Sequence, residues 1–573
     1  MRFLLLMLPC WSRRFGQPSA SLRGVTRSVP LLAASLGVLL GACKEQKTST
    51  GEPKSVIGRV NKEKSAARLP VLGERRLEGA GQDLRASPDG QVLTVLLEAQ
   101  KPPITGVPPP MRLGALWAVP TQGGKPHKLG NGVTNMPGGW LHTADSRWVL
   151  FAAGWDPAQQ VGELYVQDAK QLDAERQRIS AKVNYFVPSD DGTQLAFVEG
   201  GVLHAGKLPA GPFPQLAGEV STAEFSADGR YLYFKRKFSS AGGLYQVDLK
   251  EERPQPKRLV DQVTEYTVLR SGKHVVVSAR ATPADRTFQL HVFDVDTLKT
   301  RKIADDAHRY RVSRDGRYLA WRDNVPGPDK GALWLMALPD GKPRQLGANV
   351  ADFDFSPDGA RFVYRDNYVE LALGGRDSPM DDKKLVERVG DLYVLEMPDG
   401  KPRQLARQCP NFLFAPGGSA LAYTARIDRP EVTRRLYLYP VGAAEPFPLK
   451  DWLYEYQFVA TGDVLYFRSD CLREGRACDL NAISAKAGKD EKAKKVIEGT
   501  YGFRFSADGK RALLAFAHLT DQTFDLALRN LETGEQKMLD QYVEWPGLLL
   551  ADGAVAYLVN EKNRAGVYVA KSP

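Results

Sequence analysis

The chain has 573 residues, of which 43% are hydrophobic and 25% charged, with 53 glycines and 38 prolines. This balance excludes a disordered chain and indicates a large, turn-rich globular protein. The formal charge of +11 includes five arginines in the first 42 residues, and no Lys/Arg cluster interleaved with aromatic residues follows. We therefore expect no nucleic-acid partner.

Residues 1–42 have the pattern of a secretory signal peptide. Arg23 and Arg27 precede an apolar stretch from Val29 to Leu40, which is short for a bilayer span but suits a signal-peptide core. The stretch ends in Leu-Gly-Ala-Cys43, which resembles the lipobox of bacterial lipoproteins. The resemblance implies cleavage before Cys43, acylation of its thiol and a stable membrane anchor. The alternative is an ordinary cleavable signal with a chance cysteine.

Residues 44–55 are polar and without aromatic residues, so we expect residues 43–66 to form a lipidated, flexible tether. Residue 44 is lysine, not the aspartate that retains many lipoproteins in the inner membrane. The resemblance therefore favours the outer membrane over the inner one. We expect a lipid-anchored envelope protein whose body lies in the periplasm or at the cell surface.

One short phrase recurs along the chain: a small residue followed by Asp-Gly, between two apolar segments. Asp-Gly favours a tight turn, because Gly accepts positive φ and Asp hydrogen-bonds the backbone that follows it. A structural role is therefore expected for these residues rather than a catalytic one. The complete copies end in Asp89-Gly90, Asp191-Gly192, Asp228-Gly229, Asp315-Gly316, Asp358-Gly359 and Asp508-Gly509.

With five degenerate copies, the phrase marks 11 units, spaced mostly by 37 to 46 residues. In the unit around Asp228 we expect four short strands, at residues 224–226, 231–234, 243–249 and 256–259. A second turn recurs as Pro-Asp-Gly-Lys-Pro-Arg-Gln-Leu at 339–346 and 398–405, where proline suits an edge strand. Four strands per unit and no helical pattern predict an all-β fold of β-propeller blades.

With this repeat, residues 80–571 resemble the WD40-like family called PD40, which includes TolB-like propellers. Residues 70–77 look like the outer strand that the last unit lacks, so we expect the N-terminal segment to close that blade. Eleven blades exceed the usual four to eight in one ring. The prediction is therefore two propellers, at 67–303 (about five blades plus the closing strand) and 304–573 (about six blades).

Long connections between the second and third strands favour a binding surface on one face of the propeller. The insertion from Asp366 to Gly390 and the proline-rich stretch at 102–110 are the strongest candidates, with neutral loop drift as the alternative. The candidate binding residues are Asp366, Asn367, Tyr368, Arg376, Asp377, Asp381, Asp382, Pro108, Pro109 and Pro110.

Three cysteines follow Cys43. In an oxidising compartment Cys471 and Cys478 can form a disulfide worth about 2–3 kcal/mol by chain entropy, and a zinc-binding pair is the competing interpretation. We expect Cys409 to be buried and inert.

No catalytic residue, metal site or cofactor is predicted. The Gly-x-Ser-x-Gly, His-Glu-x-x-His and phosphate-loop motifs do not occur, and the seven histidines are scattered. The leading hypothesis is a non-enzymatic envelope module that binds a protein or glycan. The rival is a propeller enzyme, a polysaccharide lyase or hydrolase with a central metal. A structural subunit of an envelope complex is the third hypothesis.

Overall fold

The computed structural model describes residues 72–102, 111–236, 242–269, 271–281, 287–323, 331–372, 386–427, 434–451, 453–471, 477–517 and 523–571. The chain divides into two units, residues 1–68 and residues 69–573, and everything described lies in the second unit. The described residues form β-strands joined by turns and contain no helix, which confirms the all-β prediction.

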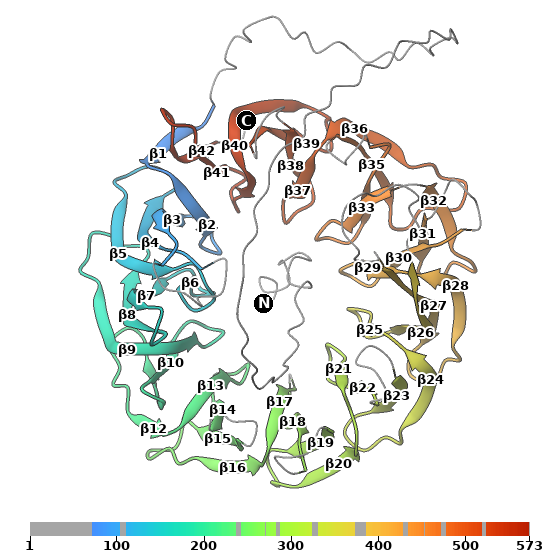
Figure 1. Ribbon diagram of the computed structural model, residues 1–573, viewed down its shortest axis with the longest axis horizontal. Helices are drawn as coiled ribbons and strands as arrows, with labels where there is room; N and C mark the ends of the chain where they lie inside the picture. The colour runs from blue at the N-terminus through green and yellow to red at the C-terminus, as the bar shows by residue number, and fades with distance from the viewer. Residues whose placement is uncertain are drawn as a thin grey trace, which may run out of the picture. The chain divides into compact units, whose positions relative to one another are not determined.

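Seven of the sheets are four-stranded, antiparallel propeller blades (Figure 1). In the first three strands of each blade, apolar residues either alternate with polar ones or follow one another directly. Both faces of the sheet are covered by neighbouring sheets, so both can be apolar. These blades are formed by β2 (Gly81–Ala86), β3 (Val92–Gln100), β4 (Leu113–Pro120) and β5 (His127–Thr134); β13 (Val220–Phe225), β14 (Tyr231–Arg236), β15 (Leu244–Asp248) and β16 (Lys257–Val260); β17 (Val263–Val268), β18 (His274–Ala279), β19 (Gln289–Asp294) and β20 (Thr300–Ala304); β21 (Arg309–Val312), β22 (Tyr318–Arg322), β23 (Gly331–Ala337) and β24 (Arg344–Val350); β25 (Phe353–Phe355), β26 (Arg361–Ala372), β27 (Val386–Glu396) and β28 (Arg403–Cys409); β29 (Asn411–Phe414), β30 (Ala420–Ala425), β31 (Arg435–Pro440) and β32 (Phe447–Asp451); β33 (Leu453–Phe458), β34 (Val464–Ser469), β35 (Cys478–Ser484) and β36 (Lys494–Thr500).

Two further sheets have seven strands each. One contains β6 (Trp140–His142), β7 (Trp148–Asp156), β8 (Val161–Asp168), β9 (Gln177–Pro188), β10 (Gln194–Glu199), β11 (Val202–Lys207) and β12 (Gln215–Ala217). The other contains β1 (Glu74–Glu78), β37 (Gly502–Phe505), β38 (Arg511–Ala517), β39 (Thr523–Asn530), β40 (Gln536–Leu549), β41 (Val555–Val559) and β42 (Gly566–Ala570).

The predicted series of about 11 separate units is not supported, because a long strand joins two units in each seven-stranded sheet. The first half of β9 pairs with β8 and its second half pairs with β10. In the same way β40 pairs first with β39 and then with β41. The expected break between the outer strand of one unit and the inner strand of the next does not occur there.

The predicted division into two propellers near residue 304 is not supported either. Within residues 69–573, successive sheets follow one another round a single ring (Figure 1). Across the proposed boundary, Val276 and Leu290 share one buried cluster with Leu319 and Trp321. Because the apolar faces of β17–β20 and β21–β24 bury one another, the two sheets belong to one continuous core.

The ring is closed by the N-terminal strand, as predicted. Strand β1 pairs antiparallel with β42, from Glu74 opposite Val569 to Glu78 opposite Gly566. Leu77 packs against a buried cluster in which β3 and β42 contribute Leu93 and Val567. Pairing between the two ends of this unit removes an open sheet edge.

The recurring Asp-Gly phrase forms a hydrogen-bonded turn between the first two strands. In each complete copy the serine hydroxyl donates to the aspartate Oδ1 at 2.5–2.6 Å. The same hydroxyl oxygen accepts the backbone N–H five residues later, as Tyr231 donates to Ser226 at 2.8 Å. The serine hydrogen bond is the main reason that the pKa of Asp228 lies below its usual value. The turn glycines have φ of 68–74°, which supports the structural role expected for these residues.

Arginines of the second recurring phrase link neighbouring blades, a role that the sequence analysis did not predict. Arg344, in the outer strand β24, donates to the carbonyl of Gly400 in the next blade at 3.3 Å. Arg403, at the same position of β28, donates to the carbonyl of Ala444 at 2.8 Å. The outer turns of consecutive blades are therefore fastened by side-chain to backbone hydrogen bonds.

Candidate functional site

Antiparallel pairing gives each blade two different ends. The Asp-Gly turns and the turns between the third and fourth strands lie at one end, which we name the turn face. The connections between the second and third strands lie at the other end, which we name the loop face. The candidate residues 366–368 belong to the loop face, whereas Arg376, Asp377, Asp381, Asp382, Pro108, Pro109 and Pro110 lie outside the described residues.

Strands β26 and β27 extend beyond the rest of their blade and form a two-stranded arm. After the regular pairing ends at Asp366 and Asp391, a bulge is followed by four more pairs, from Val369 with Val389 to Ala372 with Val386. Strand β25 pairs only as far as Tyr364. We use "the arm" for Val369–Ala372 with Val386–Val389. Its residue Val369 is 44% exposed, although it is a large aliphatic residue.

Buried Arg365 holds the root of the arm. Its guanidinium forms a bidentate ion pair with Asp352, at 2.6 and 2.9 Å, and donates to the carbonyl of Cys409 at 2.8 Å. It also donates to the carbonyls of Arg388, in the arm, and Pro410, in the connection to the next blade. Burial opposes the charge, but the hydrogen bonds and charge of Asp352 raise the pKa of Arg365 above its usual value. The arm is therefore fixed to two blades at once.

A second buried charge ties the arm to the neighbouring blade. The Glu387 side chain is only 4% exposed and forms ion pairs with Arg434 and, at 3.9 Å, with Arg426. Both arginines flank the connection from β30 to β31. A carboxylate buried to this degree requires such partners. On the exposed side of the arm, Glu370 pairs with Arg388 across the two strands at 3.1 Å.

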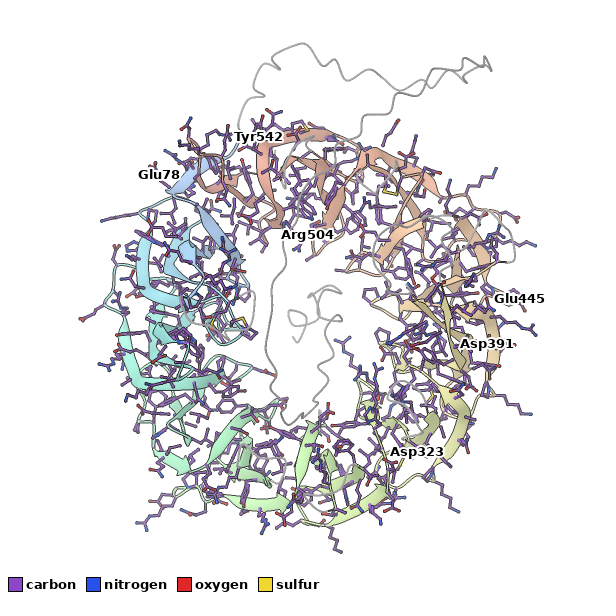
Figure 2. All side chains as sticks on the ribbon, in the orientation of Figure 1. Glu78, Asp323, Asp391, Glu445, Arg504 and Tyr542 are labelled. Carbon is purple, nitrogen blue, oxygen red and sulfur yellow. A yellow bond between two sulfur atoms is a disulfide. The ribbon has the colours of Figure 1, made fainter. Side chains whose placement is uncertain are left out.

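The three described candidate residues occupy the bulge between the blade and the arm. The Asp366 carboxylate accepts the backbone N–H of Asn349 at 2.9 Å. Asn367 has φ of 51° and donates from its amide to Asp391 at 3.0 Å. Asp391 is labelled in Figure 2. The Tyr368 side chain is buried, with 6% exposure. Asp366 and Asn367 therefore shape the bend, and Tyr368 packs beneath it.

The sequence analysis missed Arg365 and Glu387, although a signal for the arginine exists. An aromatic residue followed by arginine recurs at the end of the second strand, as Trp321-Arg322, Tyr364-Arg365 and Phe467-Arg468. All three arginines are buried. Arg322 also donates to a carbonyl at the entrance of the next blade, that of Ala351, at 2.6 Å. An arginine that recurs within an apolar strand indicates such a buried contact.

The cysteines form one disulfide and one buried thiol. Cys471 and Cys478 are bonded at the root of the β34–β35 connection, which agrees with the disulfide interpretation. Cys409 is fully buried, and burial raises the pKa of its thiol to about 12, as expected for an inert residue. Cys43 lies outside the described residues.

A polar cluster lies where β40 meets the first blade. The Asn560 amide donates to Glu544 at 2.7 Å, and its oxygen accepts the backbone N–H of Gly81 at 3.2 Å. Burial, and then the negative charge of Asp83, raise the pKa of Glu544 above its usual value. The folded ring therefore holds this carboxylate in surroundings that favour its neutral form.

Metal-binding and membrane-spanning elements were sought throughout the described part of the chain. Those residues contain no group of three or more His, Cys, Asp or Glu side chains arranged to hold a metal ion. Nor do they include a helix with the length and apolarity needed to cross a membrane.

No protein-family model and no curated protein matches this chain. Solved structures that it is similar to include the tricorn protease (13% identity, TM-score 0.28, covering 81% of this chain and 53% of that one). Others are the β-propeller domain of Myceliophteria thermophila Cps50 (14%, 0.26, 53% and 96%) and Porphyromonas gingivalis dipeptidyl peptidase 4 (12%, 0.35, 86% and 66%). The chain thus spans about half the length of the tricorn protease. Similarities at this level carry no argument about activity.

Replacing Arg365 tests how firmly the arm is held. We expect Arg365→Met to lower the free energy of unfolding by about 3 kcal/mol, because Asp352 loses its partner and buried carbonyls lose their donor. Arg388→Met is the matched control, since its ion pair with Glu370 is exposed on both sides and should cost under about 1 kcal/mol. Urea denaturation measures both, and equal losses would contradict the assigned role of Arg365.

Glu544→Gln tests the half-buried carboxylate whose neutral form the fold favours. Its folded pKa lies above the unfolded value, so charging it opposes folding once the pH rises above the unfolded pKa of about 4.3. We expect Glu544→Gln to raise the free energy of unfolding at pH 7 and to give little gain at pH 4, where both states are largely protonated. Exposed Glu535→Gln is the control. A gain of equal size at pH 4 would assign the effect to packing instead.

Proposed function

We propose that this protein is a membrane-anchored, non-enzymatic binding module of the bacterial cell envelope. The propeller is the scaffold, and the loop face recognises a protein or glycan partner. The lipobox-like Leu-Gly-Ala-Cys43 supports the anchor, and its sequence context favours the outer membrane.

The arm is the observation that carries the binding role. Four residue pairs between β26 and β27 extend past the edge of the blade, and two buried charges, Arg365 and Glu387, fix them to the ring. An isolated two-stranded hairpin is marginally stable in water. A hairpin anchored in this way presents its own exposed residues on a rigid support, which lowers the entropy lost when a partner binds. The exposed Val369 adds an apolar contact to this surface.

Replacing the residues between the two strands of the arm tests the binding role. Residues 373–385 are replaced by a short Gly-Ser linker, which leaves β26 and β27 intact, and partners are crosslinked in the native envelope and captured. We expect the partner to be lost from this variant while the melting temperature stays within a few degrees. The matched control replaces residues 324–330, the β22–β23 connection, and should retain the partner. Unchanged capture by the shortened arm would overturn this site assignment.

Replacement of the lipidated residue tests the anchor separately. We expect Cys43→Ser to move the protein from the membrane fraction to the soluble fraction, because the acyl chains would no longer be attached. The far-UV circular dichroism and the melting temperature should match those of the parent protein. Retention of Cys43→Ser in salt-washed membranes would contradict lipid anchoring.

A further inference from the structure

The turn face contains a hollow that the proposed function does not use. It has a volume of about 610 Å³ and lies where three successive Asp-Gly-type turns meet two outer turns. A volume of this size suits a small ligand. Its lining is formed by Asp145, Arg147, Trp148, Gly192, Thr193, Gln194, Lys207, Leu208, Asp228, Gly229, Arg230, Leu249 and Lys250.

The floor of the hollow is built by close contact between turns. Asp145 lies against Gly192 of the next turn so closely that a Cβ atom there would be 2.6 Å from its Oδ1. The Gln194 amide donates to the carbonyl of Gly229, in the third turn, at 2.9 Å. Trp148 and Leu208 add apolar surface between these polar groups. The three turns therefore hold a fixed relative position.

Three of the four cations in the lining form no ion pair in the described part of the chain. Arg230 is neutralised by Asp248, which accepts at 2.6 and 3.0 Å. Lys207, Lys250 and Arg147 are exposed and have no carboxylate within ion-pair distance there. The Arg147 guanidinium instead lies 4.6 Å from the centre of the Trp148 ring.

The two carboxylates of the hollow already serve the turns. Thr143 donates to Asp145 at 2.5 Å, and Ser226 donates to Asp228 at 2.6 Å. The Ser226 hydroxyl and, more weakly, the Lys250 charge keep the pKa of Asp228 low. The Asp228 carboxylate is thus ionised at neutral pH. The second oxygens of both carboxylates can accept hydroxyl donors.

We infer that this hollow binds an acidic saccharide. The unpaired cations attract carboxylates on the ligand, and the second oxygens of Asp145 and Asp228 accept sugar hydroxyls. Leu208 supplies the apolar contact for a sugar ring, because Trp148 is only 7% exposed and its ring lies under the Arg147 guanidinium. A bare phosphate or carboxylate would satisfy only the cations. The mixture of cations and acceptors therefore favours a ligand that carries both charge and hydroxyl groups.

The test is calorimetric titration of the full chain with a uronic-acid tetrasaccharide. We expect binding that weakens as salt is added and that becomes at least tenfold weaker in the double variant Lys207→Gln/Lys250→Gln. The neutral gluco-tetrasaccharide and inorganic phosphate are titrated alongside, and each should bind at least tenfold more weakly than the uronic-acid probe. Equal binding of phosphate, or of the neutral sugar, would overturn the inference.

Two control variants separate this site from other causes. Lys486 occupies the position of Lys250 in another blade. Leu249, before Lys250, donates its N–H to the carbonyl of Arg230, and Ala485, before Lys486, donates to the carbonyl of Asp463 at the end of the equivalent turn. Lys486→Gln should therefore leave the affinity unchanged. Equal weakening in Lys486→Gln would mean that the probe follows the overall charge, and would overturn the site. The variant with residues 373–385 replaced should bind the saccharide normally, so that failure of the arm and failure of the hollow are distinguishable.

Discussion

Closure of the ring is the constraint on which the rest of the structure depends. Each sheet presents apolar side chains on both faces, and each face is buried by a neighbouring sheet. Phe234 and Val247, for example, are buried against Val198 and Leu203 of the preceding sheet. Such an array would end in an exposed apolar face and an open strand edge. Pairing of β1 with β42 removes both ends. The surface features on either face then rest on blades that are held from two sides.

Local chemistry made the inner turns predictable. Serine, aspartate and glycine within one phrase determine the bend. The serine–aspartate hydrogen bond, the backbone hydrogen bond to the serine and the positive φ of the glycine all fall within six residues. The number of separate sheets was not predictable in this way. Residues 177–187 contain neither glycine nor proline, so the chain continues as one strand where a break between units was expected. In β40, Pro546 and Gly547 lie within the strand and do not end it.

The two-propeller prediction was wrong for a different reason. It relied on the usual number of blades in known rings, and no residue near position 304 argued for a boundary. The number of sheets that close a ring depends on the angle between neighbours, which is determined by the side chains packed between them, such as Trp321 and Met336. That packing involves pairs of residues far apart in the sequence. A single sequence read unit by unit cannot supply the angle.

The candidate site shows the same division between local and distant information. The long Asp366 to Gly390 connection could be located from the sequence, because its length is a local property. The contacts that make its root rigid could not, since Arg365 meets Asp352 and Cys409 from other strands and Glu387 meets Arg434 of another blade. In isolation these residues look like ordinary polar positions of a strand. The recurrence of arginine after an aromatic residue was the available signal.

The two faces differ because the turns on one face cannot change length freely. Inserting a residue between Ser226 and Tyr231 would break the hydrogen bonds that both Asp228 and the second strand make with the serine. No such phrase recurs in the sequence of the loop-face connections, so they can lengthen at little cost to the ring. A binding site on the turn face must therefore be built from substitutions, such as Lys207 and Lys250, on an unchanged backbone. A site on the loop face can be built by extending the chain, as the arm is.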